Sequence, residues 1–326
     1  MKKSTGAPSE GFLPGKLFRT YEEQVELLES RGMVVEDADW AIKVLRRVSY
    51  YRLSGYWYSF REFKLDGSGR GDTFKAGTTF GDVLALYDFD VRLRAAVFTS
   101  LAPIELSIRA LLGHELGRID PQVHFRPELL GPTARKSGTA TASSRFTNWS
   151  QKYENELNRS QEDFVKHHRE RYGGQLPVWV AVEILDWGKM THLYGLSPNA
   201  VRDAIAAEVD LTAAQLDSWL KSLNIVRNYA AHHGRMFNRV YALKPKLPES
   251  GRKPELASLE SLKNRTFAQL ALIQFLLTQL KVGDSRLIPA VMRSYPDVKI
   301  VPISRMGVPN GWNTHPLFGP FTNEHG

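Results

Sequence analysis

The longest helical pattern in the chain runs from Thr79 to Gly117, and it constrains the fold more than any other feature. Apolar residues recur there every three or four positions, as one buried face of an α-helix requires; they include Val83, Leu86, Tyr87, Val91, Leu93 and Leu101. Pro103 lacks a backbone N–H, so we expect either two helices or one long helix that kinks near it. The pattern predicts a mainly α-helical protein.

Other segments share this period, on both sides of the long pattern. They are Thr20–Arg31, Asp37–Val48, Trp149–Arg171, Pro177–Leu193, a helix opened by Ser197-Pro198, Thr212–Gly234 and Leu256–Leu280. Thr20 with Glu23, and Thr212 with Gln215, have the spacing of a capping box. The Gly-rich stretch Asp66–Asp72 predicts a turn between two short strands, because no Gly-Lys-Ser/Thr follows it as a phosphate-binding loop needs.

Composition shifts give the expected domain limits. Residues 1–16 contain Gly, Pro and Ser and predict a flexible arm, 17–282 a single helical domain, and 283–326, rich in Pro and Gly, an irregular C-terminal extension. The low-complexity stretch 134–146 predicts a loop whose Arg135, Lys136 and Arg145 could contact phosphates.

Charge and cysteine content narrow the function classes. The chain has no cysteine, which excludes disulfides and thiolate chemistry and favours a cytoplasmic location. No apolar segment follows the basic N-terminus, so we expect no signal peptide, and the longest apolar run, near Leu270–Leu277, is too short to span a bilayer. The net charge of +8 attracts phosphate polyanions, so nucleic acid is the first partner to consider.

The densest aromatic segment runs from Tyr50 to Arg61. Tyr56 and its neighbours alternate with Arg52 and Arg61, which would suit stacking on RNA bases. The alternative, which we favour, is that these rings fill a core around a tight bend at Gly55, because large aromatic side chains mostly pack inside.

The helix that ends near Gly234 carries the residues best suited to chemistry. Asn228 and His232 lie four apart and share a face, and Arg227 flanks it. A histidine in the last turn can exchange protons near neutral pH, and an arginine beside it can neutralise a phosphate. Further polar residues that could contact RNA follow directly: His233, Arg235, Asn238 and Arg239. This set suits RNA cleavage by the RNA's own 2′-hydroxyl, without a metal or cofactor.

The run Arg227-Asn228-Tyr229-Ala230-Ala231-His232 resembles the Arg-x4-His motif of the HEPN superfamily. Its surroundings, from Trp219 to Arg239, are similar to the Abi-like family of AbiD/AbiF-type abortive-infection proteins. Four further blocks carry the likeness: Tyr51–Tyr56, Leu86–Asp90 with Leu93-Arg94, Ile104-Glu105, and Pro177-Val178-Trp179 with Glu183. Five ordered blocks are far more specific than the motif alone.

The resemblance implies a HEPN-type helical bundle with extra helices, RNA as substrate, and a role in phage defence. It also implies a homodimer, since HEPN ribonucleases place two motifs at one cleft and this chain has one clear copy. A degenerate second copy at Arg109 and His114 lacks the polar residue after the arginine. A small structured RNA is a further implied partner, and Gly234 stands where other HEPN toxins carry a tyrosine that an antitoxin modifies.

Three interpretations of these residues stay open at this point. In the first, Arg227, Asn228 and His232 are catalytic in a metal-independent endoribonuclease. In the second, they only bind RNA in a toxin–antitoxin-like defence system, and in the third they form a buried polar network that fixes helix packing. Glu105 and Arg109, four apart on a mostly apolar surface, are expected to pair with each other or with a third group. These two residues and Glu183 are expected to support the site.

Overall fold

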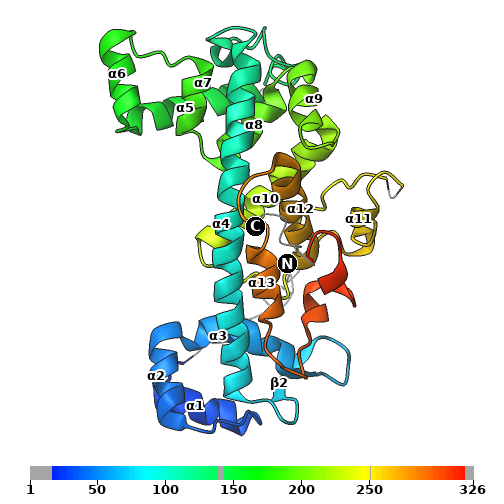
Figure 1. Ribbon diagram of the computed structural model, residues 1–326. Coiled ribbons are helices and arrows are strands. Elements are labelled where there is room, and N and C mark those ends of the chain that lie inside the picture. The colour runs from blue at the N-terminus through cyan, green and yellow to red at the C-terminus, as the bar shows by residue number, and fades with distance from the viewer. Residues whose placement is uncertain (1–16, 139–142, 250, 320–326) are drawn as a thin grey trace, which may run out of the picture. The chain divides into compact units, whose positions relative to one another are not determined.

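The structure is a computed structural model that describes residues 17–138, 143–249 and 251–319. The described residues form 13 α-helices, several short 3-10 helices and one two-stranded antiparallel sheet, so the chain is mainly α, as expected (Figure 1). The chain divides into two compact units, Met1–Leu84 and Ala85–Gly326. The arm predicted for 1–16 lies outside the described residues.

Unit 1 contains three helices and the hairpin. The helices are α1 (Tyr21–Ser30), α2 (Ala38–Val48) and α3 (Tyr50–Trp57), and the strands are β1 (Arg61–Phe63) and β2 (Arg70–Phe74). Thr20 and Glu23 form the predicted capping box of α1. The predicted turn between two short strands is also confirmed. The hairpin is fixed to the chain after α1, because the amide of Phe74 donates to the carbonyl of Arg31 at 2.8 Å.

The aromatic segment fills the core of unit 1, as the favoured interpretation predicted. Tyr56, Trp57 and Phe60 are at most 1% exposed. The tight bend expected at Gly55 is wrong: Gly55 lies inside α3, and the chain continues as a helix through it. Because Tyr56 is buried, neither face of its ring is accessible to an RNA base. The expectation that Tyr56 contacts RNA was therefore wrong.

One continuous helix, α4 (Phe80–Gly117), forms the long pattern, so of the two alternatives that of two separate helices was wrong. It begins in unit 1 and continues through unit 2 as the long cyan helix of Figure 1. Pro103 lies inside it, and its carbonyl accepts a hydrogen bond from the hydroxyl of Ser107 at 2.8 Å. Buried leucines and isoleucines line one side of α4 within unit 2, at positions 86, 93, 101, 104, 108, 112 and 116.

By length and composition, α4 is also the one helix of the described residues that could cross a membrane. The expectation concerned the longest uninterrupted apolar run, near Leu270–Leu277, whereas α4 reaches this length with charged residues inside it. However, the helix carries two intramolecular ion pairs, Asp90–Arg94 and Glu105–Arg109, and a buried apolar side. These features are typical of the core helix of a water-soluble protein.

The remaining helices of unit 2 are shorter than the sequence pattern suggested. They are α5 (Arg145–Arg159), α6 (Asp163–Arg171), α7 (Val178–Ala181), α8 (Trp187–Leu196), α9 (Asn199–Ala207), α10 (Ala213–Ala231), α11 (Pro254–Ala257), α12 (Thr266–Leu280) and α13 (Leu287–Arg293). The pattern over 149–171 is divided by Ser160, whose extended backbone ends α5. Arg145 opens α5, so the expected loop ends before it.

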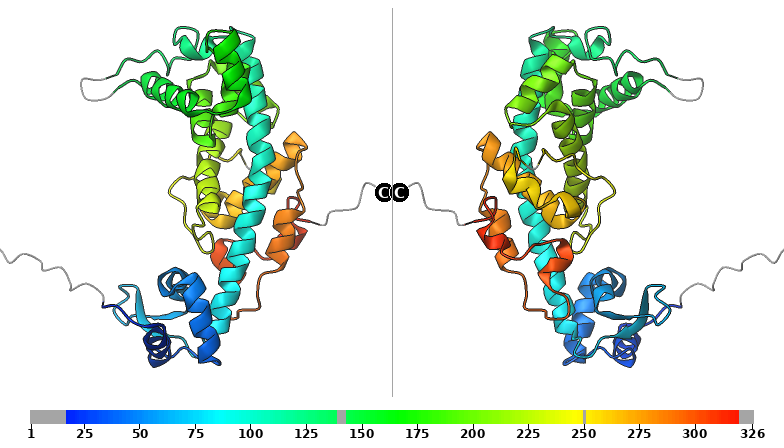
Figure 2. Two further views of the ribbon diagram at one scale, coloured as in Figure 1. Left: turned by 90° about the vertical axis from the view of Figure 1, so that its left-hand side faces the viewer. Right: turned by 90° about the vertical axis from the view of Figure 1, so that its right-hand side faces the viewer.

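Helix α12 forms the centre of unit 2. It is apolar on all sides, and every residue from Thr266 to Leu277 is buried. Helix α10 packs against α8, α9 and α12. In Figure 2 the green and yellow helices α8 and α10 lie on one side of α4, and the orange α13 lies on the other. The site helix α10 is thus held between partners on several faces.

The C-terminal segment is more ordered than the irregular extension we expected. It contains α13 and two 3-10 helices, and Ile288, Met292 and Phe318 are fully buried. The sequence hid α13 because Pro289 lies in it. A proline is tolerated there since the first turn of a helix has no internal partner for its N–H groups.

Candidate functional site

The candidate site lies at the C-terminal end of α10. Thr212 and Gln215 form the predicted capping box at the other end of this helix: the Thr212 amide donates to the Gln215 side chain at 2.9 Å, and the Gln215 amide donates back at 3.3 Å. The buried side of α10 consists of Leu216, Trp219, Leu220, Ser222, Leu223, Val226 and Ala230. This stripe fixes the rotation of the helix, so that Asn228 and His232 point outward.

Two hydrogen bonds hold α10 to its neighbours near the motif. The indole N–H of Trp187 donates to the carbonyl of Leu220 at 2.8 Å, and the hydroxyl of Ser222 donates to the side chain of Gln269 on α12 at 2.8 Å. Both are buried, where a lost partner leaves an unsatisfied polar group. The motif helix therefore has a defined position against α8 and α12.

The helix ends one residue earlier than the sequence suggested. His232 is the C-cap, with its amide bonded to the Asn228 carbonyl at 2.9 Å, and His233 adopts the left-handed conformation with φ of 56°. The amide of Gly234 then donates to the carbonyl of Tyr229 at 2.8 Å, which is the Schellman arrangement. The left-handed position expected at Gly234 belongs to His233.

Gly234 has a steric role instead. A Cβ at this position would lie 2.4 Å from Cδ1 of Tyr229, so any other residue would require the Tyr229 ring to move. The guanidinium of Arg239 covers the same tyrosine ring, 3.8 Å from its centroid, and its Nε donates to the Arg235 carbonyl at 2.5 Å. The turn after the motif is therefore folded tightly onto the last turn of α10.

A buried carboxylate secures this turn. Asp90 on α4 is fully buried and accepts from the amide of Phe237 at 2.7 Å and from that of Met236 at 3.2 Å. It also pairs with Arg94 at 2.5 Å. Both residues belong to one of the blocks that resemble the family, but this role was not predicted; their spacing of four on an apolar helix was the available indication.

Arg227 is half-buried beside α4. Its guanidinium lies 5.6 Å from the ring centroid of Phe98, and its Nε is buried with no hydrogen bond to any described residue. Asp186, the N-cap of α8, lies close enough to Arg227 for the charge of the arginine to affect its pKa. Burial opposes ionisation of Asp186, but hydrogen bonds from Lys189 and the charges of Lys189 and Arg227 lower its pKa. A buried unsatisfied N–H is uncommon and can be satisfied by a ligand.

The other expected site residues divide into two groups. Asn228, His232 and His233 are exposed, with Arg235 half-buried in the same turn. Asn238, whose φ is 49°, accepts a hydrogen bond from Arg265 at 2.8 Å, and Arg239 lies on Tyr229, so both have roles within the protein. Arg52 is half-buried on α3 and, with Tyr56, belongs to unit 1.

Glu105 and Arg109 pair as the sequence predicted. Arg109 lies 2.8 Å from Glu105 and 3.6 Å from Glu183, and it donates to the carbonyl of Leu185 at 3.0 Å. That carbonyl lies at the break between the 3-10 helix Val182–Ile184 and α8. The cluster thus fixes the start of α8, the helix whose N-cap Asp186 faces Arg227. That the cluster supports the site remains a prediction.

No cluster of three or more potential metal ligands occurs among the residues described. The expectation that the site needs no metal or cofactor remains a prediction.

A comparison with protein families decides the family. The model of the Abi-like protein family matches residues 43–238, more than half of the chain. This chain belongs to the Abi-like family. The match begins within α2 and ends at Asn238, directly after the turn that Asp90 secures, so it contains the whole Arg227–His232 motif. Searches of curated proteins and of solved structures gave no match. Membership of this family associates the protein with abortive infection, a form of phage defence.

Proposed function

We propose that this Abi-like protein is a cytoplasmic HEPN-type endoribonuclease that cleaves RNA without a metal during phage defence. The observation that carries the proposal is the arrangement at the end of α10. Arg227 has a buried, unsatisfied N–H, while Asn228 and His232 are exposed one turn apart. This supplies a cation for the phosphate and a proton-exchanging group beside it.

In this mechanism the 2′-hydroxyl of the RNA attacks the adjacent phosphorus. The bond to the 5′-oxygen breaks, leaving a 2′,3′-cyclic phosphate on one fragment and a 5′-hydroxyl on the other. Arg227 neutralises the charge that develops on the phosphorane, His232 exchanges a proton with the entering or leaving oxygen, and Asn228 orients the phosphate. His233 and Arg235 extend the RNA contacts.

Exposed apolar residues on α4, beside the motif, support the proposal that a second chain contributes to the active site. Along the part of α4 in unit 2, Val91, Phe98 and Leu106 are 40%, 44% and 56% exposed, with Ala95 and Ala102 between them on the same side. This apolar stripe includes the ring that Arg227 lies on. Exposed apolar patches of this kind mark association surfaces. We propose that a homodimer joins two Arg227–His232 motifs there.

The test of catalysis compares wild type with Arg227→Ala, His232→Ala and the double variant on total RNA in EDTA. Removal of a general acid or base is expected to slow cleavage by about 10²- to 10⁴-fold, and products should carry 2′,3′-cyclic phosphates. His167→Ala, an exposed histidine on α6, is the matched control and should cleave normally.

The competing function is RNA binding without cleavage, in a toxin–antitoxin-like system. The observation in its favour is that Arg227 lies over the ring of Phe98 with a buried Nε that has no hydrogen bond to a described residue, which suits holding an RNA phosphate without any cleavage. RNA binding by the wild type that weakens in the double variant, with cleavage by neither protein, would establish it and refute the ribonuclease. RNA that co-purifies with the protein should be sequenced, because the charge of +8 and the family fit a small structured regulatory RNA.

The dimer is tested separately with Leu106→Glu. A charge in the middle of the stripe should yield a monomer in light scattering and abolish cleavage. Leu262→Glu, at an apolar residue 41% exposed elsewhere in unit 2, should change neither. A monomeric Leu106→Glu protein with full activity would exclude a shared site.

A further inference from the structure

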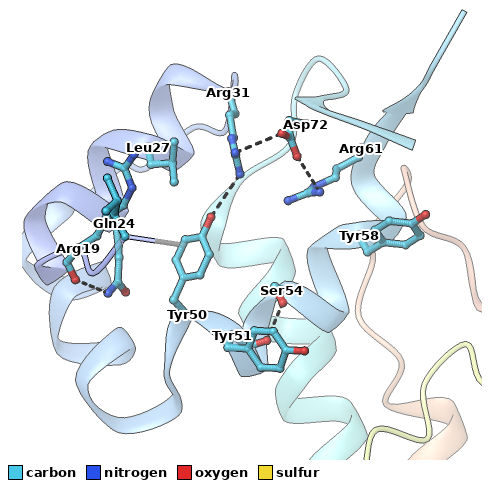
Figure 3. Close-up of a pocket in the computed structure, with 11 residues that line it drawn as sticks. Arg19, Gln24, Leu27, Arg31, Tyr50, Tyr51, Ser54, Tyr58, Arg61 and Asp72 are labelled. Atoms are coloured by element: carbon cyan, nitrogen blue, oxygen red, sulfur yellow. Dashed lines mark hydrogen bonds and ion pairs between the residues drawn. The ribbon is translucent and has the colours of Figure 1, made fainter. Parts of the chain in front are cut away.

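We propose that unit 1 has its own ligand site, a pocket that binds one nucleotide through its phosphate and its base. A cavity of about 620 Å³ lies between α1, α3 and the hairpin (Figure 3). That volume is within the usual range of small-molecule sites. The site is separate from the Arg227–His232 motif, and the inference does not depend on the proposed ribonuclease activity.

The phosphate would bind to two arginines that share one carboxylate. Arg31 lies 3.3 Å and Arg61 3.0 Å from opposite oxygens of Asp72, and Figure 3 shows both guanidinium groups directed at it. Their side chains are 25% and 16% exposed, whereas that of Asp72 is 66% exposed. The Nε of Arg61 is buried with no hydrogen bond to a described residue. Charged donors that are half-buried and incompletely used are suited to a phosphate.

The charge of the pocket favours an anion. Arg19 joins Arg31 and Arg61 in the lining, while Asp72 is its one carboxylate. A purely structural link between α1 and the hairpin would need one arginine for this carboxylate. Here the cations exceed the anion, and the open cavity beside them remains accessible to a ligand.

Tyrosines on the same wall provide the surface for a base. Tyr51 is 83% exposed and Tyr58 is 49% exposed, although both lie beside buried aromatic residues of α3. Tyr50 helps to position Arg31, one of the two arginines proposed to bind the phosphate, because its hydroxyl accepts a hydrogen bond from Arg31 at 3.4 Å. Gln24 presents a buried side-chain carbonyl oxygen that accepts no hydrogen bond from a described residue and could accept from a ribose hydroxyl or a base amino group. Cations beside tyrosine faces are the usual elements of single-nucleotide recognition.

The experiment measures binding to the full chain by calorimetry, with adenosine 5′-monophosphate, adenosine and inorganic phosphate as probes. The monophosphate should bind tighter than either part. Arg61→Gln should weaken its binding about tenfold or more, as loss of a charged hydrogen bond does. Arg47→Gln, an exposed arginine of α2 outside the pocket lining, is the matched control and should bind like wild type.

Two further variants keep the test decisive if Arg61→Gln proves unstable. Tyr51→Ala, at an exposed ring, should weaken the monophosphate about fivefold or more without affecting inorganic phosphate. Asp72→Asn should strengthen phosphate binding about fivefold, because it removes the negative charge that Arg31 and Arg61 share. A merely structural Asp72 would give no gain.

The source of the nucleotide is distinguished with a 2′-O-methyl tetranucleotide, which cannot be cleaved by 2′-hydroxyl attack. Tighter binding of its 5′-phosphorylated form than of the monophosphate identifies the end of an RNA strand as the ligand. Weaker binding identifies a free nucleotide. The proposal is overturned if neither probe binds, or if binding is unchanged in folded Arg61→Gln, Tyr51→Ala and Asp72→Asn proteins.

Discussion

Each unit contains a cluster in which arginine side chains pair with one aspartate, and the two clusters differ in how exposed the aspartate is. In unit 2, Asp90 and Arg94 are 0% and 5% exposed, and the carboxylate also binds two backbone amides of the turn after the motif. In unit 1, Asp72 is largely exposed between Arg31 and Arg61, one of which keeps an unsatisfied N–H. The buried cluster fixes a backbone conformation, and the exposed cluster leaves donors for a ligand.

The difference teaches that burial, more than residue type, decides what such a cluster does. A buried charge must be fully paired, so its partners cannot be given up to a ligand. A half-exposed charge exchanges partners at small cost because water screens it. The four predictions below test this contrast, from the largest expected effect to the smallest.

Asp90→Asn should have the largest effect on stability. The amide keeps the shape of the side chain but leaves Arg94 buried without a counter-charge, which costs about 3–5 kcal/mol of unfolding free energy. Urea unfolding measures the loss. Asp88→Asn, at an exposed residue on the same helix, is the control and should change stability by about 0.5 kcal/mol or less.

The double variant Asp90→Asn/Arg94→Met sharpens this prediction. Removing both charges should restore part of the stability lost in Asp90→Asn, since a buried pair is often no better than apolar residues of similar size. A single Asp90→Asn variant within 1 kcal/mol of wild type would show that burial does not govern this cluster.

His124 shows what happens when a buried ionisable group has no partner. It is fully buried among Phe125, Trp149 and Tyr153, and burial lowers its pKa to about 4. Between pH 6.5 and 4, His124 binds a proton in the unfolded protein but stays neutral in the folded protein. Stability should therefore fall between about pH 6.5 and 4, by up to about 3 kcal/mol, and be independent of His124 above that window.

Comparing unfolding at pH 7 and pH 4.5 measures this loss. In His124→Leu the loss on acidification should be smaller than in wild type, whatever the variant's stability at pH 7. His167→Leu, at an exposed histidine, should keep the wild-type loss. Identical losses in wild type and His124→Leu would contradict the role of burial.

Gly234→Ala tests the turn that Asp90 secures. The added methyl must displace the ring of Tyr229, which Arg239 covers, so we expect a loss of about 1–3 kcal/mol. Gly251→Ala, where no atom lies near the added Cβ, is the control. RNA cleavage should fall in Gly234→Ala even at temperatures where the protein is folded; full activity would separate the turn from the site.

Asp72→Asn should have the smallest effect on stability, about 0.5 kcal/mol or less, because exposed ion pairs contribute little. Thermal unfolding in the absence of nucleotide measures it. A loss of several kcal/mol would mean that this cluster also holds the fold and would remove the contrast.

Much of the fold could be predicted from the sequence because local patterns decided it. The capping boxes at Thr20 and Thr212 are two such cases. Helix breaks were missed where the deciding contact is distant in sequence. Leu185 leaves the helical conformation without any glycine or proline, and the donor that binds its carbonyl, Arg109, lies 76 residues earlier.

The candidate site shows the same limit. The motif residues lie together because they are close in the sequence, so their grouping at the end of α10 was predictable. The partners of Arg227, which are Phe98 and Asp186, come from other helices and could not be predicted from spacing. Nor could the pocket of unit 1, since Arg31 and Asp72 are 41 residues apart.

The all-round burial of α12 has a consequence for the timing of synthesis. Helix α10 and the turn after it emerge from the ribosome before residues 266–280, and both depend on them: Ser222 binds Gln269, and the hydroxyl of Thr266 donates to the carbonyl of Met236. A nascent chain that has not yet reached α12 holds the motif on an unsupported helix. The supported arrangement of the motif therefore forms only after residues 266–280 have been synthesised.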